Sequence, residues 1–224
     1  MKFDYSIVRS NRKTVKVIVE RDRTVIVRAP HEISEEAIAV AMEKRQRTIL
    51  QKINNNQKYP FERRAKEFVS GESLLYLGRF YQLQIVDDPV DGVLFEGKFI
   101  ISRDNQKQAK QLFQNWYHRR AAEIIVPAAV SIAKQIGVSF NKINILDLKF
   151  RWGSCTPKDN IHFNWRLIKA PANVIDYIIV HELTHLLEAN HTSKFWHRVK
   201  TSLPKYQAQK KWLLEFGYEL EVEL

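Results

Sequence analysis

Two histidines with a glutamate between them form the pattern with the clearest chemical meaning in this chain. Residues 181–185 read His-Glu-Leu-Thr-His, which has the form H-E-x-x-H. Residues four apart lie on one face of an α-helix, so His181 and His185 are expected to present two imidazoles to one metal ion. Glu182 is expected beside the metal, in the place of a general base for a metal-activated water. The pattern predicts metal-assisted hydrolysis, provided that a helix carries it.

The residues before and within this pattern are typical of a buried helix. Pro171 suits a first helical turn, because its missing N–H would be unpaired there anyway. Apolar residues then predominate, which favours a helix buried on most sides; they are Val174, Ile175, Ile178, Ile179, Leu183, Leu186 and Leu187. Buried polar groups need partners, and a bound metal would satisfy His181, Glu182 and His185.

The third metal ligand is predicted to be His191, six residues beyond His185. A catalytic zinc site usually takes three protein ligands and leaves one position for water. Asn190 favours the turn that brings His191 back, since asparagine adopts the left-handed conformation that ends helices. The spacing equals that of the metzincin pattern, but Glu188 stands at the glycine position, so that class is not assigned. Three imidazoles suit zinc best, with nickel, cobalt and manganese as alternatives.

Glu188 has three interpretations on the sequence alone. It lies near the His181 face of the helix, which would allow it to be a fourth ligand or a partner of an imidazole N–H. A solvated residue at the helix end is the simpler interpretation. Cys155 is expected to be a small buried residue, because a metal-activated water makes a thiolate nucleophile unnecessary.

Composition indicates a globular protein with anionic partners. The chain has 224 residues, 45% apolar and 27% charged, which suits one large domain or two small ones. The start of the chain has no apolar signal region, no apolar run approaches a membrane span, and Cys155 has no second cysteine to pair with. We therefore predict a cytoplasmic protein without a membrane. The net charge of +11 favours nucleic acid, nucleotides or acidic surfaces, although a solvated basic surface is simpler.

The sequence predicts an α+β protein whose N-terminal region, residues 1–102, is rich in β-structure. Residues 3–29 alternate polar and apolar side chains and predict three strands. A helix over residues 34–53 follows, with Ser34 as its N-cap. A hairpin turning near Gly78 and a further pair of short strands complete the region.

Residues 103–224 are predicted to form a zincin-like metal-dependent hydrolase domain. A helix capped by Asp104 is expected to be kinked or divided by Pro127. Two extended segments, 143–150 and 161–167, come before the H-E-x-x-H helix. Many zinc peptidases place an edge strand over the cleft, where an extended substrate adds to it. This order of elements therefore favours a peptidase.

Several longer motifs occur in a characteristic order. They are RSNRKTVKVIVERDRTVIVRAP near the start, YLGRFYQLQIV in the middle, RWGSC at 151–155, NWRLIKAP at 164–171 and VHELTHLLEANHTSKFW at 180–196. Through them the chain resembles the YgjP-like metallopeptidase family, bacterial metal-dependent hydrolases related to the SprT and WLM zinc peptidases. The resemblance implies a zincin-type C-terminal domain, with His181, His185 and His191 as ligands and Glu182 as catalytic base.

The resemblance also implies that Arg151, Trp152 and Arg166 lie near the cleft. The planar guanidinium groups of the two arginines would suit an anionic group of the substrate. The alternative interpretation is structural, with Trp152 in the core and both arginines paired with local carboxylates.

Three functions remain open on the sequence. The first is a zinc-dependent metallopeptidase, supported by the motif and the expected edge strand. The second is a metal-dependent nucleoside triphosphate pyrophosphatase acting on UTP, an activity attached to bacterial members of the family; the chain has no Gly-rich phosphate loop to support it. The third is a nucleic-acid-associated protease or binding protein that docks through its basic N-terminal segments. The peptidase hypothesis is preferred.

Overall fold

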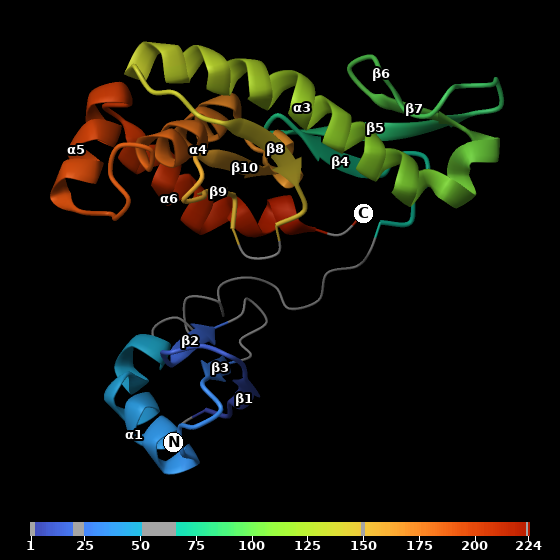
Figure 1. Cartoon of the computed structure of the whole chain (residues 1–224). Coiled ribbons are helices and arrows are strands. Elements are labelled where there is room, and N and C mark those ends of the chain that lie inside the picture. Colours follow the sequence, from blue (N-terminus) through green and yellow to red (C-terminus); the bar gives the residue numbers. More distant parts are fainter. Residues whose placement is uncertain (1–2, 20–24, 51–65, 149–150, 223) are drawn as a thin grey trace. The chain divides into compact units, whose positions relative to one another are not determined.

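Alternating apolar residues of the N-terminal part form a three-stranded sheet (Figure 1). Its elements are β1 (Ser6–Arg9), β2 (Lys16–Val19) and β3 (Val25–Ala29), followed by helix α1 (Glu35–Lys44). The central strand β3 runs parallel to β1 and antiparallel to β2. Its alternate residues are buried in one apolar cluster with Ile38 and Met42 of α1. The three strands predicted within residues 3–29 are confirmed.

The helix after this sheet is shorter than predicted. The hydroxyl of Ser34 accepts a hydrogen bond of 3.3 Å from the backbone N–H of Ala37, which confirms the N-cap. The helix ends at Lys44, and helical residues resume only at 46–50 after a turn at Arg45. Glu43, Lys44 and Arg45 are all exposed, so no contact with the core keeps the chain helical at this turn. An unbroken helix was therefore a wrong prediction, and its last part lies outside the described residues.

The structure is a computed structural model that describes residues 3–19, 25–50, 66–148, 151–222 and 224. It divides the chain into two compact units, Met1–Arg63 and Arg64–Leu224. This division differs from the domain boundary predicted after residue 102. The physical reason is that the strands between residues 73 and 102 share one apolar core with the helix that follows them.

Strands and a long helix form the first half of the second unit. They are β4 (Ser73–Tyr76), β5 (Arg79–Val86), β6 (Leu94–Phe95), β7 (Phe99–Ser102), the 3₁₀ helix Arg103–Gln108 and α3 (Ala109–Ile136). The sheet has the order β4-β5-β7-β6. The indole of Trp116 on α3 meets the rings of Tyr76 and Phe99 edge-on, with centroids 4.9 and 5.0 Å away. Such pairs join the sheet to the helix.

Helix α3 differs from the prediction at Asp104 and at Pro127. Asp104 lies within the preceding 3₁₀ helix and is not the N-cap of α3. The helix also continues through Pro127 without a break, because Ile125 and Ala129 on either side are fully buried and packing offsets the lost hydrogen bond. It ends at Gly137, whose φ of +78° closes the last turn.

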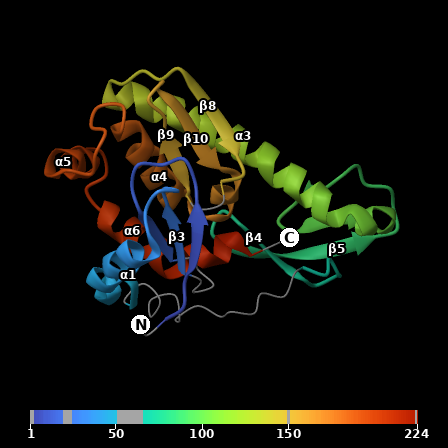
Figure 2. The same ribbon diagram turned by 60° about the horizontal axis from the view of Figure 1, so that its bottom comes forward.

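The second half of the unit carries the predicted site. Its elements are β8 (Lys142–Leu146), β9 (Gly153–Cys155), β10 (Asn160–Asn164), the 3₁₀ helix Trp165–Lys169, α4 (Ala172–Thr184), α5 (Ser193–Ser202), α6 (Tyr206–Phe216) and the 3₁₀ helix Gly217–Glu221. The sheet order is β8-β10-β9, so β9 lies at an edge (Figure 2). Both predicted extended segments are confirmed but end earlier. The first ends at Leu146, and its predicted last residues, 149–150, lie outside the described part of the chain. The residues after Asn164 form a 3₁₀ helix.

The turn between β4 and β5 supports the start of α4. The backbone N–H groups of Leu77 and Gly78 donate to the carbonyls of Ile168 and Lys169, at 3.0 and 2.8 Å. Gly78 has a φ of +79°, and a Cβ there would lie 2.7 Å from Cγ of Pro171. Only glycine fits both demands. The β4–β5 hairpin thus holds the residue from which α4 begins.

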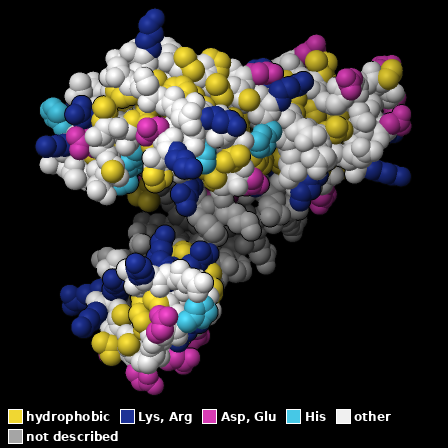
Figure 3. Space-filling view, in the orientation of Figure 1, with side chains coloured by type: hydrophobic (Ala, Val, Ile, Leu, Met, Phe, Trp, Pro, Cys, Tyr) yellow, Lys and Arg dark blue, Asp and Glu magenta, His cyan; other side chains and the backbone are white. Residues whose placement is uncertain are grey.

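The surface carries its basic charge on both units. Figure 3 shows lysine and arginine side chains on each of them, with acidic side chains nearby. None of the helices within the described ranges has the length and apolar character needed to cross a membrane.

Candidate metal centre

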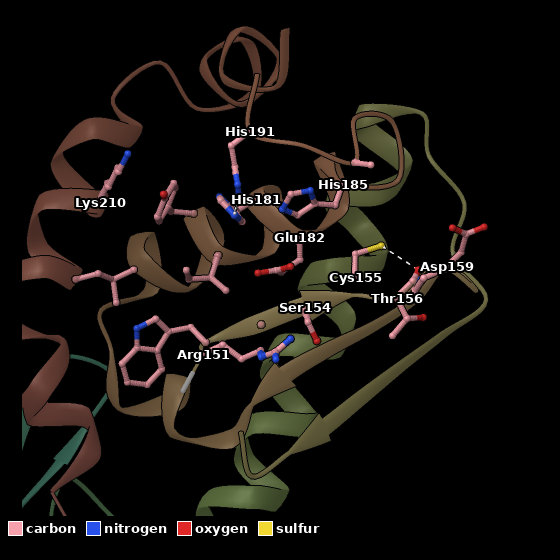
Figure 4. Close-up of a pocket in the computed structure, with 17 residues that line it drawn as sticks. Arg151, Ser154, Cys155, Thr156, Asp159, His181, Glu182, His185, His191 and Lys210 are labelled. Carbon is pink, nitrogen blue, oxygen red and sulfur yellow. Dashed lines mark hydrogen bonds between the residues drawn. The ribbon is translucent and has the colours of Figure 1, made fainter. Parts of the chain in front are cut away.

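Three imidazoles converge at the C-terminal end of α4 (Figure 4). His181 lies in the last turns of the helix, His185 is its C-cap, and His191 lies in the loop before α5. The Nε2 atoms of His181 and His191 are 2.9 Å apart, and the ligating nitrogens of all three lie within 4.8 Å of one another. The structure therefore brings the three predicted ligands together.

The backbone of Glu188 orients one of these rings. Nδ1 of His185 donates a hydrogen bond of 3.1 Å to the carbonyl oxygen of Glu188, which leaves Nε2 of His185 for a metal. The carboxylate of Glu188 instead pairs with Arg198 at 3.3 Å. It does not belong to the three-histidine group. Glu188 thus contacts the site as a partner of an imidazole N–H, through its main chain.

The donor set fits a divalent metal ion such as zinc. Burial, followed by the charges of His185 and His191, lowers the pKa of His181 to about 3, so its imidazole is neutral and can donate a lone pair. Tetrahedral zinc with Zn–N bonds of about 2.0–2.1 Å places two ligand nitrogens roughly 3.3 Å apart. The 2.9 Å between Nε2 of His181 and Nε2 of His191 is close to this value, and no pair of the three exceeds 4.8 Å. Nδ1 of His181 is buried and has no hydrogen-bond partner among the described residues.

Aromatic rings of α5 support the histidine that comes from the loop. Thr192 caps α5 by accepting from the backbone N–H of Phe195 at 3.4 Å. The helix therefore begins directly after His191. The ring of Trp196 stacks on His191 with 5.6 Å between centroids. The centroid of the Phe195 ring lies no more than 5.0 Å from the centroid of each of the three imidazoles. These contacts hold an otherwise exposed residue near the other two imidazoles.

Glu182 is a buried acid that points into the site. Its side chain lies between the histidines and strand β9 (Figure 4), and the residue is 6% exposed. Burial raises its pKa to about 8, whereas the charge of Arg151 and a hydrogen bond from the backbone of Cys155 act in the opposite direction. A buried carboxyl beside three imidazoles is suited to exchange protons with a bound water.

Gly153 makes the closest approach to this acid. A Cβ at position 153 would lie 2.6 Å from Cγ of Glu182, and 2.9 Å from its Cδ and Oε1. Strand β9 therefore packs directly against the Glu182 side chain. The absence of a side chain in the middle of RWGSC is what allows this packing.

The site opens into a cleft of about 850 Å³ between α4, α6 and the β9 region. Arg151 and Trp152 line it, as the resemblance implied. Arg166 does not line it. Its guanidinium pairs with Asp147 and stacks over the ring of Trp165, with its Cζ 4.4 Å from the ring centre.

Two further results concern residues of the cleft wall. The pKa of the Cys155 thiol is raised by burial and then by the charges of Asp159 and Glu182, so the thiol stays protonated. Cys155 is half-buried and lines the cleft, so it is less buried than predicted. Lys210 of α6, which the sequence analysis did not single out, also lines the cleft. No spacing pattern links it to the H-E-x-x-H motif, so only the packing of α6 against α4 could reveal it.

Comparisons with known proteins identify the family of this chain. The chain is similar to two solved structures, the metallopeptidase zymogens abylysin of Pyrococcus abyssi and jannalysin of Methanocaldococcus jannaschii. Abylysin is 18% identical with a TM-score of 0.38, and the match covers 41% of this chain and 92% of the abylysin chain. Jannalysin is 20% identical with a TM-score of 0.35, and the match covers 43% of this chain and 95% of the jannalysin chain. A search of curated protein sequences finds no significant match. The profile of the YgjP-like metallopeptidase domain matches residues 13–216. The chain therefore belongs to the YgjP-like family, and it is a metal-dependent hydrolase of the metallopeptidase type.

Proposed function

We propose that this protein is a zinc-dependent peptidase in which Glu182 is the general base. The observation that carries the proposal is the position of the Glu182 carboxyl, buried between three converging histidines and the edge strand β9. A zinc ion held by His181, His185 and His191 would supply Lewis-acid activation of water and of the scissile carbonyl. Glu182 takes the proton of the attacking water and returns it to the leaving amine.

Strand β9 is suited to hold an extended peptide. Within the described residues it pairs with no strand other than β10, so main-chain groups on its other edge are available to a peptide, except the N–H of Cys155, which donates to Glu182. The same strand contacts Glu182 through Gly153. A peptide added to this edge would therefore run past the general base. Neither the nucleotide nor the nucleic-acid alternative has a comparable feature among the described residues.

The function is tested with the zinc-loaded protein and two sets of substrates. One set is a mixed-sequence peptide library analysed by mass spectrometry, and the other is a panel of nucleoside triphosphates that includes UTP. We expect cleavage of a subset of peptides, which stops when zinc is removed with a chelator and returns when zinc is added. Pyrophosphate release from UTP together with intact peptides would overturn the peptidase assignment.

Gly153→Ala is expected to lower kcat/KM for a cleaved peptide about 100-fold while zinc content stays unchanged. The new methyl group overlaps the Glu182 side chain, and a displacement of about 1 Å in a catalytic group costs roughly this much. Gly217→Ala is the matched control, because a Cβ there meets its nearest neighbour, Trp152, at an ordinary 3.5 Å. Wild-type kinetics in Gly153→Ala would show that close packing by β9 does not position the base.

A further inference from the structure

Two cations of the cleft form no close ion pair with the residues that the structure describes. Arg151 lies next to β9, and Lys210 extends from α6; both line the cleft, whose acidic lining residues are Glu182 and Asp159. Neither Arg151 nor Lys210 forms an ion pair within 4.0 Å with any described residue, whereas the neighbouring Lys211 pairs with Glu215 at 3.7 Å. With a divalent ion added, the cleft would have a net positive charge.

Lys210 is held close to the metal centre. Its Nζ lies 4.2 Å from the centre of the Trp196 ring, and the same ring stacks on His191. Figure 4 shows Lys210 on the His181 side of the cleft, at the opposite end from Asp159. A cation placed on an aromatic face keeps a defined position without a carboxylate. Its charge therefore remains available to a ligand in the cleft.

We propose that Lys210 is a specificity residue that binds a carboxylate of the peptide substrate, so that the enzyme prefers peptides with an acidic group close to the scissile bond. This inference rests on the proposed peptidase function and names its substrate class. A peptide laid along β9 would lie near both cations, because Arg151 adjoins β9 and Lys210 lines the same cleft from α6. Acidic side chains and free C-termini carry the same carboxylate chemistry, so the test must distinguish them.

Binding and cleavage are measured separately with matched peptides. Cleaved library sequences are resynthesised with each Asp or Glu replaced by Asn or Gln, and with a free or an amidated C-terminus. Dissociation constants are measured by fluorescence anisotropy on zinc-loaded Glu182→Gln protein, and kcat/KM on the Glu182 protein. Each measurement is repeated with Lys210→Gln, with the charge-retaining Lys210→Arg, and with Lys211→Gln as a control from the same helix.

We expect the acidic peptides to bind and react about fivefold to tenfold better than their neutral counterparts, as for one charge-assisted contact. Lys210→Gln should abolish this preference, while Lys210→Arg and Lys211→Gln should keep it. If the side-chain replacements remove the preference, the carboxylate is internal; if amidation removes it, the carboxylate is terminal.

Three results separate this inference from the function on which it rests. Peptide cleavage without any acidic preference would overturn the inference and leave the peptidase function standing. An equal fall of kcat for acidic and neutral peptides in Lys210→Gln would also overturn it, since Lys210 would then act on the reaction and not on selection. Preferential binding of acidic peptides without cleavage would overturn the peptidase function alone.

Discussion

Glu182→Gln is expected to retain bound zinc and to lose about 100- to 10,000-fold of the peptidase rate, the usual contribution of a general base. Glutamine has nearly the same size and fits the same buried space. Its amide oxygen can still accept the hydrogen bond from the backbone of Cys155. It cannot take a proton from water, so chemistry is lost while the three imidazoles remain in place. Zinc content by mass spectrometry and kcat on a cleaved peptide measure the two effects separately.

Glu188→Gln is the matched control for this prediction. Glu188 lies six residues further along, and its carboxylate pairs with Arg198 at the surface. Its contribution to the metal centre is its carbonyl oxygen, which the substitution keeps. We expect its rate to stay within about twofold of wild type, because exposed ion pairs contribute little. A Glu182→Gln protein with the wild-type rate would rule out Glu182 as the base.

The parts of the site that follow from helix geometry were predictable from the sequence. The spacing of His181 and His185 places both on one helical face, and the structure has this helix from Ala172 to Thr184. The approach of His191 was harder to foresee, because it depends on a loop. Its sequence signal was the spacing from His185. In the structure, the Thr192 cap starts α5 at once and limits where the loop can go.

Other features of the site depend on contacts between segments far apart in the sequence. Gly153 contacts Glu182 only because β9 packs on α4, and Lys210 reaches the cleft only because α6 does. Arg166 has the same chemistry as Arg151, but Asp147 and Trp165 hold it outside the cleft. A residue type and a motif could not distinguish these two arginines, since the difference lies in their tertiary neighbours.

The fold shows the same division between local and tertiary causes. Strands with alternating burial and helices with clear caps were predictable, as at Ser34 and Gly137. Pro127 was misleading, because burial on both sides of it keeps α3 continuous against the local preference. Strands β4–β7 and helix α3 share one core because their aromatic rings pack together. The periodicity of apolar residues in the sequence does not show which rings meet.

His185→Ala is expected to abolish both zinc binding and activity. The substitution removes the ligand whose ring is oriented by the Glu188 carbonyl, and two imidazoles are too few for a tight zinc site. When the free zinc concentration is 100 times the Kd, zinc binding to the folded state raises the free energy of unfolding by about 2.7 kcal/mol. In a protein of this size, that increase raises Tm by about 5–10 °C. The wild type and Glu182→Gln should show this zinc-dependent rise, and His185→Ala should not.

His197→Ala is the control for the loss of a histidine as such. His197 is exposed on α5 and is not part of the three-histidine group, so its Tm should still rise with zinc. Calorimetry with and without zinc, together with a circular dichroism spectrum of each apo protein, separates loss of the metal from loss of the fold. A zinc-dependent rise of wild-type size in His185→Ala would place the metal elsewhere. It would also remove the physical basis for assigning Glu182 as the base, because that role requires a water activated beside it.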